Sequence, residues 1–493
     1  MRFPVSVALL ALAGQLAAAQ NPTSPPETSI SLEQAIALAR QNNPNYLGTL
    51  TGRRTADAAV RAAYGAFLPS LSSSFGASYQ AAGSQVFQGL TFTGSSDAVT
   101  SRYNLGVSYS LSAASFMNPK LQKANRAATE ANIVGQAEAL RAGVTGAYLD
   151  ALAARANATL QDTLVISSEG QLALAQAKMQ TGQGTILDVN SAEVALGQAR
   201  IAALTAHNDA RIKVVTLYQQ MGVPMPASPD DVTLTTTFNT TLPVFSLDSL
   251  LHLAEARNPA IDALRASQRA ASVGVSTAKA RYTPSLSLNT GWGGNTYEYT
   301  NSDYLVGRAQ AGLMQAYGSC QINDSIRIRV GLTAYGCGSP TLSAAQASQI
   351  RSENSVFPFK FTSSPFSVSA SLSLPIFDGF SREQGVQQAI AQKQSAEYQL
   401  KAQELQTRTQ VTQALLNLEL ASRTIALREQ NADKAREEYQ FAQERYKVGQ
   451  ANYLDVTTAH ATFVQAQVDR LTSIYDFQKA FAALESAVGR PLR

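Results

Sequence analysis

The sequence of 493 residues has little charge, because Asp, Glu, Lys and Arg make up only 15% of it. An average soluble protein carries about 25% of these residues. The net charge is only +4, and the Lys and Arg residues are scattered along the chain. A nucleic-acid-binding surface needs a concentrated basic patch. We therefore expect no nucleic acid among the partners of this protein.

The sequence also lacks the motifs of an enzyme. It has three histidines, His207, His252 and His460, and each stands alone in a predicted helix. There is no glycine-rich phosphate loop and no nucleophile motif. We therefore expect no catalytic residue, no cofactor and no metal site.

Cysteine is scarce as well. Cys320 and Cys337 are the only two, and both lie in one segment rich in Gly, Ser and Tyr. No His or further Cys is near them, so their spacing does not indicate a metal site. In an exported protein such a pair favours a disulfide that closes a surface loop. Two free thiols are the alternative.

Long apolar runs are missing after the N-terminus, so we expect no membrane-spanning helix in the mature chain. Residues 1–19, MRFPVSVALLALAGQLAAA, have the layout of a cleavable secretory signal, with Arg2, a short apolar run and three alanines. A membrane anchor is the alternative, but this apolar run is short for a bilayer. We expect an exported protein.

What the chain does contain is an internal duplication. SLEQAIALARQNNP at 31–44 returns as SLDSLLHLAEARNP at 246–259, and LPSLSSSFG at 68–76 returns as TPSLSLNTG at 283–291, both 215 positions later. The motifs MQTGQGTILDV and YKVGQANYLDV are 267 positions apart, so the second copy is 52 residues longer. Such repeats predict two copies of one structural unit.

The repeats divide the chain into four parts. We assign the signal to 1–19, a first repeat to 20–224, a linker to 225–245 and a second repeat to 246–493, with a loop insertion at about 293–365. Each repeat begins with a short helix that Asn-Pro ends, and a second helix follows. Two strands joined by a loop come next, and then a long helical hairpin.

The predicted strands lie at 71–79, 103–112, 285–292 and 366–374. Apolar and aromatic residues alternate in them with small uncharged ones, mostly serine and glycine. This alternation favours a transmembrane β-barrel with lipid outside and water inside, and a soluble sandwich is the alternative. Four strands cannot close a barrel, and lipid does not tolerate open edges. Several copies of the chain must therefore pool their strands.

Two proline-free runs, Lys120–Val223 and Ile376–Arg490, predict long helices with heptad spacing and many small residues, as in closely packed coiled coils. Gly182 and Gly449 interrupt them at positions suited to a left-handed cap, so we expect a hairpin turn at each. Asp188 and Asp455 would then follow the turns, where a carboxylate stabilises a helix N-terminus.

The duplication, the SLEQAIALARQNNP opening, the LSLPIFDG exit at 372–379 and the paired G…LDV turns together resemble the outer-membrane efflux (TolC-like) family. The resemblance implies an α+β membrane protein. In it a homotrimer forms one β-barrel, with four strands per chain, continued by a long α-helical coiled-coil barrel across the periplasm. It also implies a location in the bacterial outer membrane, in contact with its lipid.

The resemblance gives roles to the hairpin turns. Gly182, Leu187, Gly449 and Leu454 would mark the tips that dock a periplasmic adaptor protein, which links to an inner-membrane transporter. Asp455 matches an acidic ring at the pore constriction, and Tyr446 and Asp188 match a pair that latches helices at the tip. Two residues depart from the family pattern: Ala451 replaces its basic latch partner, and Thr458 its second ring carboxylate.

The implied function is that of a passive exit duct in a tripartite efflux or secretion system. A duct for type I protein secretion is an alternative, since the transporter decides the cargo. A second alternative is an exported coiled-coil scaffold that forms no channel.

Overall fold

The computed structural model describes residues 29–87, 90–238 and 245–492. The predicted signal at 1–19 and part of the linker lie outside the described residues. The chain forms two compact units: a helical unit of 29–57, 124–272 and 391–492, and a strand-bearing unit of 58–123 and 273–390. Each unit takes residues from both sequence repeats, so the repeats do not fold as separate bodies.

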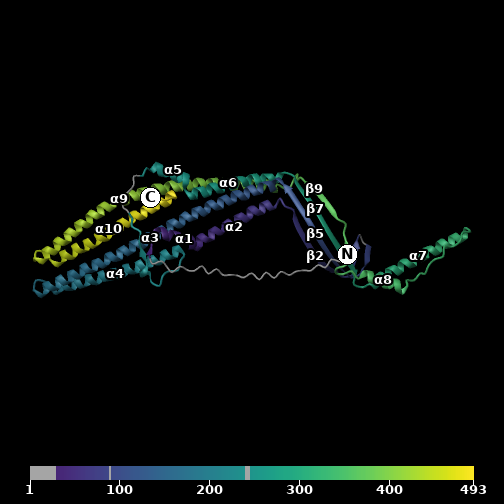
Figure 1. Ribbon diagram of the computed structural model, residues 1–493, viewed down its shortest axis with the longest axis horizontal. Helices are drawn as coiled ribbons and strands as arrows, with labels where there is room; N and C mark the ends of the chain where they lie inside the picture. The colour runs from purple at the N-terminus through teal and green to yellow at the C-terminus, as the bar shows by residue number, and fades with distance from the viewer. Residues whose placement is uncertain (1–28, 88–89, 239–244, 493) are drawn as a thin grey trace. The chain divides into compact units, whose positions relative to one another are not determined.

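Eight helices follow the predicted order of the two repeats. In the first repeat they are α1 (Leu32–Asn42), α2 (Pro44–Gly65), α3 (Ala113–Gln180) and α4 (Ile186–Met221). In the second they are α5 (Leu247–Arg257), α6 (Pro259–Lys279), α9 (Ser381–Lys447) and α10 (Tyr453–Val488). The pairs α3–α4 and α9–α10 are long hairpins (Figure 1). No described helix is both long enough and apolar enough to cross a membrane.

The two Asn-Pro motifs end the first helix of each repeat, as predicted. Their asparagines also bind that helix to the end of the long hairpin. Asn43 caps α1, and its side-chain amide donates to the Gln220 carbonyl at 2.8 Å. Asn258 caps α5 and donates in the same way to the Ala487 carbonyl at 2.9 Å. Each asparagine is buried, so the bond satisfies a carbonyl in the last turn of the hairpin helix.

Each repeat has its own apolar core where the short helix meets the hairpin. In the first, Tyr148 and Leu217 are buried beside α1, and the Tyr148 hydroxyl donates to the Ile30 carbonyl at 2.9 Å. In the second, Leu418 and Phe477 are buried beside α5. In the first core, β1 (Ser29–Ile30) pairs in parallel with β6 (Thr233–Leu234).

The strand-bearing unit contains the four predicted strands in one antiparallel sheet. Its order is β2 (Ser70–Gln80), β5 (Ala98–Ser112), β7 (Ser285–Tyr299) and β9 (Ser367–Ser373), with the short β8 (Thr362–Ser363) also on β7. The register places apolar residues opposite each other, as in Phe75 with Tyr103 and Leu105 with Trp292. Among the described strands, none pairs with the outer edge of β2 or of β9.

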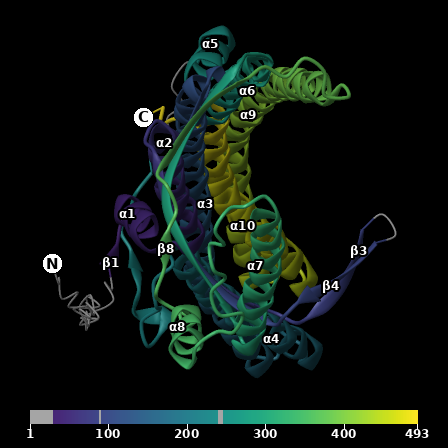
Figure 2. The same cartoon turned by 90° about the vertical axis from the view of Figure 1, so that its right-hand side faces the viewer.

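Two connections contain more structure than the sequence predicted. The loop between β2 and β5 holds a hairpin of β3 (Gly83–Phe87) and β4 (Leu90–Ser95) (Figure 2). The insertion after β7, predicted as a loop, holds α7 (Asp303–Arg329) and α8 (Ala344–Asn354). Strand β7 also runs seven residues further than the predicted end at 292. The insertion predicted as a loop at about 293–365 thus contains two helices, which its many Gly, Ser and Tyr residues did not indicate.

Candidate functional site: the hairpin tips

The two long hairpins turn with the same backbone geometry. Gly182 and Gly449 have φ angles of +71° and +77°, in the left-handed region that glycine favours. In the first turn the Gln183 N–H donates to the Lys178 carbonyl at 2.9 Å, and in the second the Gln450 N–H donates to the Arg445 carbonyl at 2.8 Å. The predicted role of both glycines as left-handed caps is confirmed by these angles.

Both returning helices begin with a capping box. The Asp188 carboxylate accepts the Thr185 backbone N–H at 2.9 Å, and Thr185 Oγ1 accepts the Asp188 N–H at 3.2 Å. The Asp455 carboxylate accepts the Asn452 N–H at 3.1 Å, and Asn452 Oδ1 accepts the Asp455 N–H at 2.8 Å. Each aspartate therefore stabilises a helix start, as expected from its position.

Behind the turns, side chains from both hairpins form one buried cluster. This tip cluster consists of Ala175, Val189, Ala192, Tyr439, Tyr446, Tyr453, Val456 and Ala459. The rings of Tyr446 and Tyr453 meet edge to face, with centroids 5.7 Å apart. Lys178 Nζ lies 5.1 Å from the centre of the Tyr446 ring and donates to Gln183 Oε1 at 3.3 Å. Since Lys178 belongs to α3 and Tyr446 to α9, this contact joins the two repeats.

The predicted latch between Tyr446 and Asp188 is not a hydrogen bond in this structure. In the part of the chain that the structure describes, the buried Tyr446 and Tyr453 hydroxyls have no hydrogen-bond partner. Burial, and secondarily the Asp188 charge, raise the pKa of Tyr446. Burial raises the pKa of Tyr453 to about 12. Both rings therefore stay neutral at physiological pH and pack as apolar groups with an unused donor.

Tyr439, a member of the tip cluster, is also the centre of a polar network. Its hydroxyl accepts from Gln171 Nε2 at 3.1 Å and from Gln443 Nε2 at 2.5 Å. Ser167 Oγ is 3.3 Å from His460 Nε2, and the His460 ring lies 5.0 Å from that of Tyr439. Burial lowers the pKa of His460 to about 4, so the imidazole is neutral at pH 7. His460, predicted as an isolated residue, thus bridges the two hairpins.

The other predicted tip residues are exposed. Leu187 and Leu454 lie in the first turns of α4 and α10, with side chains 69% and 71% exposed. Asp455 and Thr458 are exposed as well, while Ala451 is half-buried beside the tip cluster. Sequence reasoning missed Lys178 and Tyr453, because contacts between the two repeats leave no periodic signal in either one.

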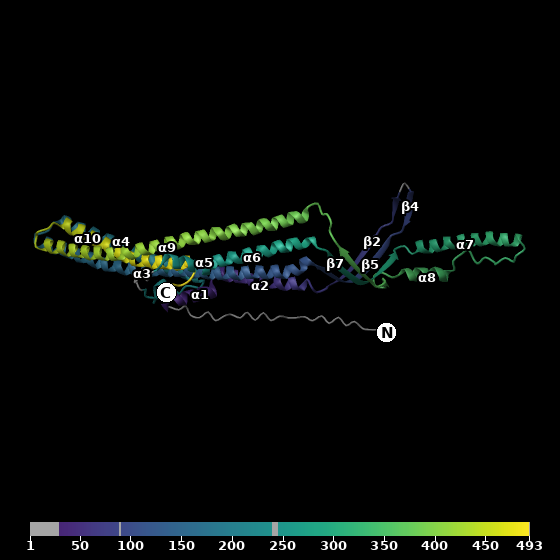
Figure 3. The ribbon, with the colours of Figure 1, turned by 90° about the horizontal axis from the view of Figure 1, so that it is seen from above.

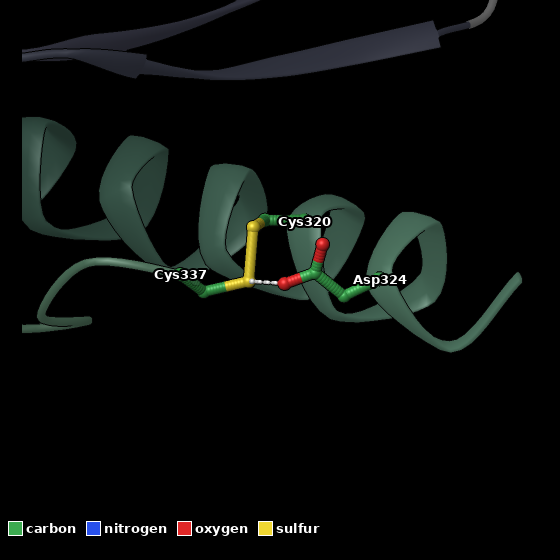
Figure 4. Close-up of side chains that lie close together, drawn as sticks. All are labelled: Cys320, Asp324 and Cys337. Carbon is green, nitrogen blue, oxygen red and sulfur yellow. Dashed lines mark hydrogen bonds between the residues drawn. A yellow bond between two sulfur atoms is a disulfide. The ribbon is translucent and has the colours of Figure 1, made fainter. Parts of the chain in front are cut away.

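In the insertion, Cys320 and Cys337 are joined by a disulfide, with Asp324 beside them (Figure 4). Ligand atoms of the three residues lie within 4.8 Å of one another. The bonded sulfurs offer no thiolate to a metal ion, however. The Asp324 carboxylate instead accepts the backbone N–H groups of Tyr335 and Gly336 at 2.8 and 3.0 Å. The disulfide and the Asp324 carboxylate therefore stabilise the turn that follows α7.

The sequence matches the family model described as outer membrane efflux protein over residues 35–223 and 339–490. No curated protein matches it. A membrane protein from Pseudomonas aeruginosa has a similar solved structure, with 20% identity, a TM-score of 0.68 and coverage of 93% of this chain and 90% of that one.

Two further solved structures are similar. VceC, an outer membrane protein of Vibrio cholerae, shares 17% identity at a TM-score of 0.66, over 94% of this chain and 97% of its own. The MtrE outer membrane channel of Neisseria gonorrhoeae, solved in its open state, shares 17% identity at a TM-score of 0.65, over 94% and 89%. These matches confirm the fold class predicted from the sequence.

Proposed function

The chain belongs to the outer membrane efflux protein family, and from this premise we propose that three copies form an exit duct of a tripartite system. The family consists of efflux channels rather than enzymes, and its members are outer-membrane proteins. In the proposed duct, three sheets close a twelve-stranded barrel in the outer membrane. The helical hairpins form a tunnel that extends into the periplasm.

The observation that carries this proposal is a set of apolar side chains on each long hairpin that stay exposed among the described residues. On α4, Leu187, Val194 and Ile201 follow one another at intervals of seven and are 69%, 61% and 66% exposed. On α9, the exposed Leu420 and Leu427 are seven residues apart, and the exposed Phe441 lies two heptads after Leu427, with Lys434 between them. Heptad stripes of this kind are the contact faces of coiled coils.

The sheet gives independent support for contact with neighbouring copies. The outer edges of β2 and β9 are unpaired among the described strands, and most side chains of both strands are exposed. Unpaired backbone groups are costly in lipid, so both edges need a strand from another copy. Pairing of β2 with the β9 of a neighbouring copy would close the barrel and remove every edge.

The tips fit the role of a regulated entrance. Leu187 and Leu454 expose apolar side chains beside the two turns, where a helical adaptor can dock, and an inner-membrane transporter would deliver cargo through that adaptor. Three copies would bring three Asp455 carboxylates around the opening. A ring of carboxylates favours cations over anions.

The test is to disrupt the stripe and then measure conductance and mass. Purified wild-type protein should insert into planar bilayers with uniform current steps. Ile201→Asp places a charge in the α4 stripe, and we expect it to abolish both the steps and the trimer. Ile201→Leu, which keeps the stripe apolar at the same position, is the matched control and should retain both. A trimeric Ile201→Asp variant with wild-type conductance would overturn the proposed assembly.

A further inference from the structure

The insertion after β7 forms an arm, which we define as residues 303–354. Its base is bound to the sheet: Asn354 Nδ2 donates to the Tyr299 carbonyl at 2.7 Å, and Asn354 Oδ1 accepts the Tyr299 N–H at 3.0 Å. The Arg351 guanidinium also forms an ion pair with Asp303 at 3.0 Å. These contacts connect the end of α8 to β7 and to the start of α7.

The returning segment of the arm covers one face of α7. The Gln310 side chain donates to the Pro340 carbonyl at 2.6 Å and accepts the Leu342 N–H at 2.8 Å. Farther along, the disulfide and the Asp324 carboxylate secure the turn after α7. Figure 3 shows α7 projecting beyond the ends of the strands, with α8 at its base. These hydrogen bonds and the disulfide therefore attach the returning segment to α7.

The opposite face of α7 is apolar and uncovered. Ala311, Met314, Ile322 and Ile326 recur at helical spacing on it and form what we call the arm ridge. The Met314, Ile322 and Ile326 side chains are 56%, 63% and 54% exposed. The stretch from 309 to 323, AQAGLMQAYGSCQIN, contains no charged residue. A helix in water normally carries charges on its exposed face, so this face points to a partner.

We propose that the arm ridge packs against the arms of the other two copies, so that three arms converge over the outer mouth of the channel. This inference rests on the proposed trimer. In the sheet, the ends of the strands that join the helices lie at 70, 112, 285 and 373, and the arm leaves from the other end of β7. Three copies therefore place three identical arms on one rim.

The distances are suitable for such packing. Twelve strands about 4.8 Å apart and tilted by about 40° give a barrel of about 12 Å radius, so neighbouring arms start about 21 Å apart. Helices pack at about 10 Å, which needs an inward shift of about 6 Å for each arm. Over the length of α7, about 40 Å at the usual helical rise, this shift is a lean of only about 9°.

The charge pattern favours another arm over a lipid or polysaccharide surface. Anionic surfaces are recognised by clustered Lys and Arg. The arm ridge contains neither, and the nearest cations on α7 are Arg308 and the Arg327–Arg329 pair at its two ends. An uncharged apolar face is instead matched by a second apolar face, and the neighbouring arms supply one at high local concentration.

The test is photo-cross-linking in intact cells. A photoreactive amino acid at position 322 should join copies of this chain into covalent dimers and trimers. The same group at position 348, an exposed serine on α8, should give at least about tenfold less product. Adding Ile326→Glu to the 322 variant should lower its yield about tenfold or more, because an unpaired carboxylate would be buried in the contact.

Two accompanying measurements report the folding of the arm and the presence of the trimer. Thiol labelling of the Ile326→Glu variant should find no free cysteine, which shows that the arm still folds. Detergent-solubilised mass reports the trimer independently. A trimer with no cross-link at position 322, or with cross-links only to a different protein, overturns the arm contact and leaves the channel standing. If the wild-type protein is not a trimer, both the arm contact and the proposed channel are overturned.

Discussion

Replacing Asp455 with asparagine separates a charge effect from a structural one. The Asp455 carboxylate accepts the Asn452 N–H at 3.1 Å, and Asn452 Oδ1 accepts the Asp455 N–H at 2.8 Å. An asparagine side chain keeps an acceptor oxygen at the same place, so the capping box survives. The variant loses only the attraction between the carboxylate and the helix dipole, about 0.3–1 kcal/mol per chain. We therefore expect it to fold and assemble.

The lost charge matters more for ions, since three copies would surround one opening. A cation about 6 Å from each of three carboxylates gains about 0.7 kcal/mol from each in water, or about 2 kcal/mol in all. Screening at physiological salt about halves this sum, because the Debye length is about 8 Å. The remaining 1 kcal/mol or so corresponds to about a fivefold preference for cations at the opening.

Reversal potentials of single channels under a salt gradient measure this preference. Asp188→Asn is the matched control, because Asp188 makes the same capping box with Thr185. We expect Asp455→Asn to weaken both cation selectivity and block by multivalent cations, and Asp188→Asn to change neither. Thr458, one turn further on, adds no charge. Unchanged selectivity in Asp455→Asn would refute the ring and leave Asp455 as a helix cap alone.

Three other predictions follow from local features. Gly182→Ala and Gly449→Ala should each lower the free energy of unfolding of the tip by about 1–2 kcal/mol, measured by hydrogen exchange. An added Cβ meets no atom within 4 Å, so the cost comes from the left-handed backbone alone, and unchanged exchange would contradict it. The tip should lose stability as the pH falls from 6.5 towards 4, because burial depresses the folded-state pKa of His460 and the unfolded chain binds the proton more tightly. His460→Gln should remove this part of the pH dependence, and an unaltered pH profile would show that another group causes it. Thiol labelling should find no free cysteine without reductant and two with it, and labelling of both without reductant would contradict the bond. Cys320→Ser with Cys337→Ser should destabilise the arm by about 3 kcal/mol, because the unfolded chain loses the constraint of a loop closed across 17 positions.

The sequence predicted well those features that depend on local pattern. Period-two alternation located all four long strands, and Asn43 and Asn258 marked the helix ends because the residue before a proline disfavours the helical conformation. The left-handed glycines of the tips were predicted for a similar reason, since few other residues adopt their backbone angles. The residues missed were those whose roles depend on contacts between the repeats. Lys178 reaches Tyr446 over 268 positions of sequence, and no spacing rule connects them.

The tip latch of Tyr446 and Asp188 came from the family resemblance and stays a prediction. The two residues are close enough for the Asp188 charge to raise the pKa of Tyr446. The Asp188 carboxylate accepts the Thr185 N–H through one oxygen, and a carboxylate can accept further hydrogen bonds. In the insertion the difficulty was composition: glycine and serine suppressed the helical signal of α7, although its apolar residues recur at helical spacing.

The mass of the detergent-solubilised protein, measured by native mass spectrometry, tests the central claim most directly. The unpaired edges of β2 and β9 and the uncovered stripes on α4 and α9 all require neighbouring copies. The account predicts a particle of three chains that is extracted from the outer membrane only by detergent. A stable monomer that remains soluble in water without detergent would contradict it.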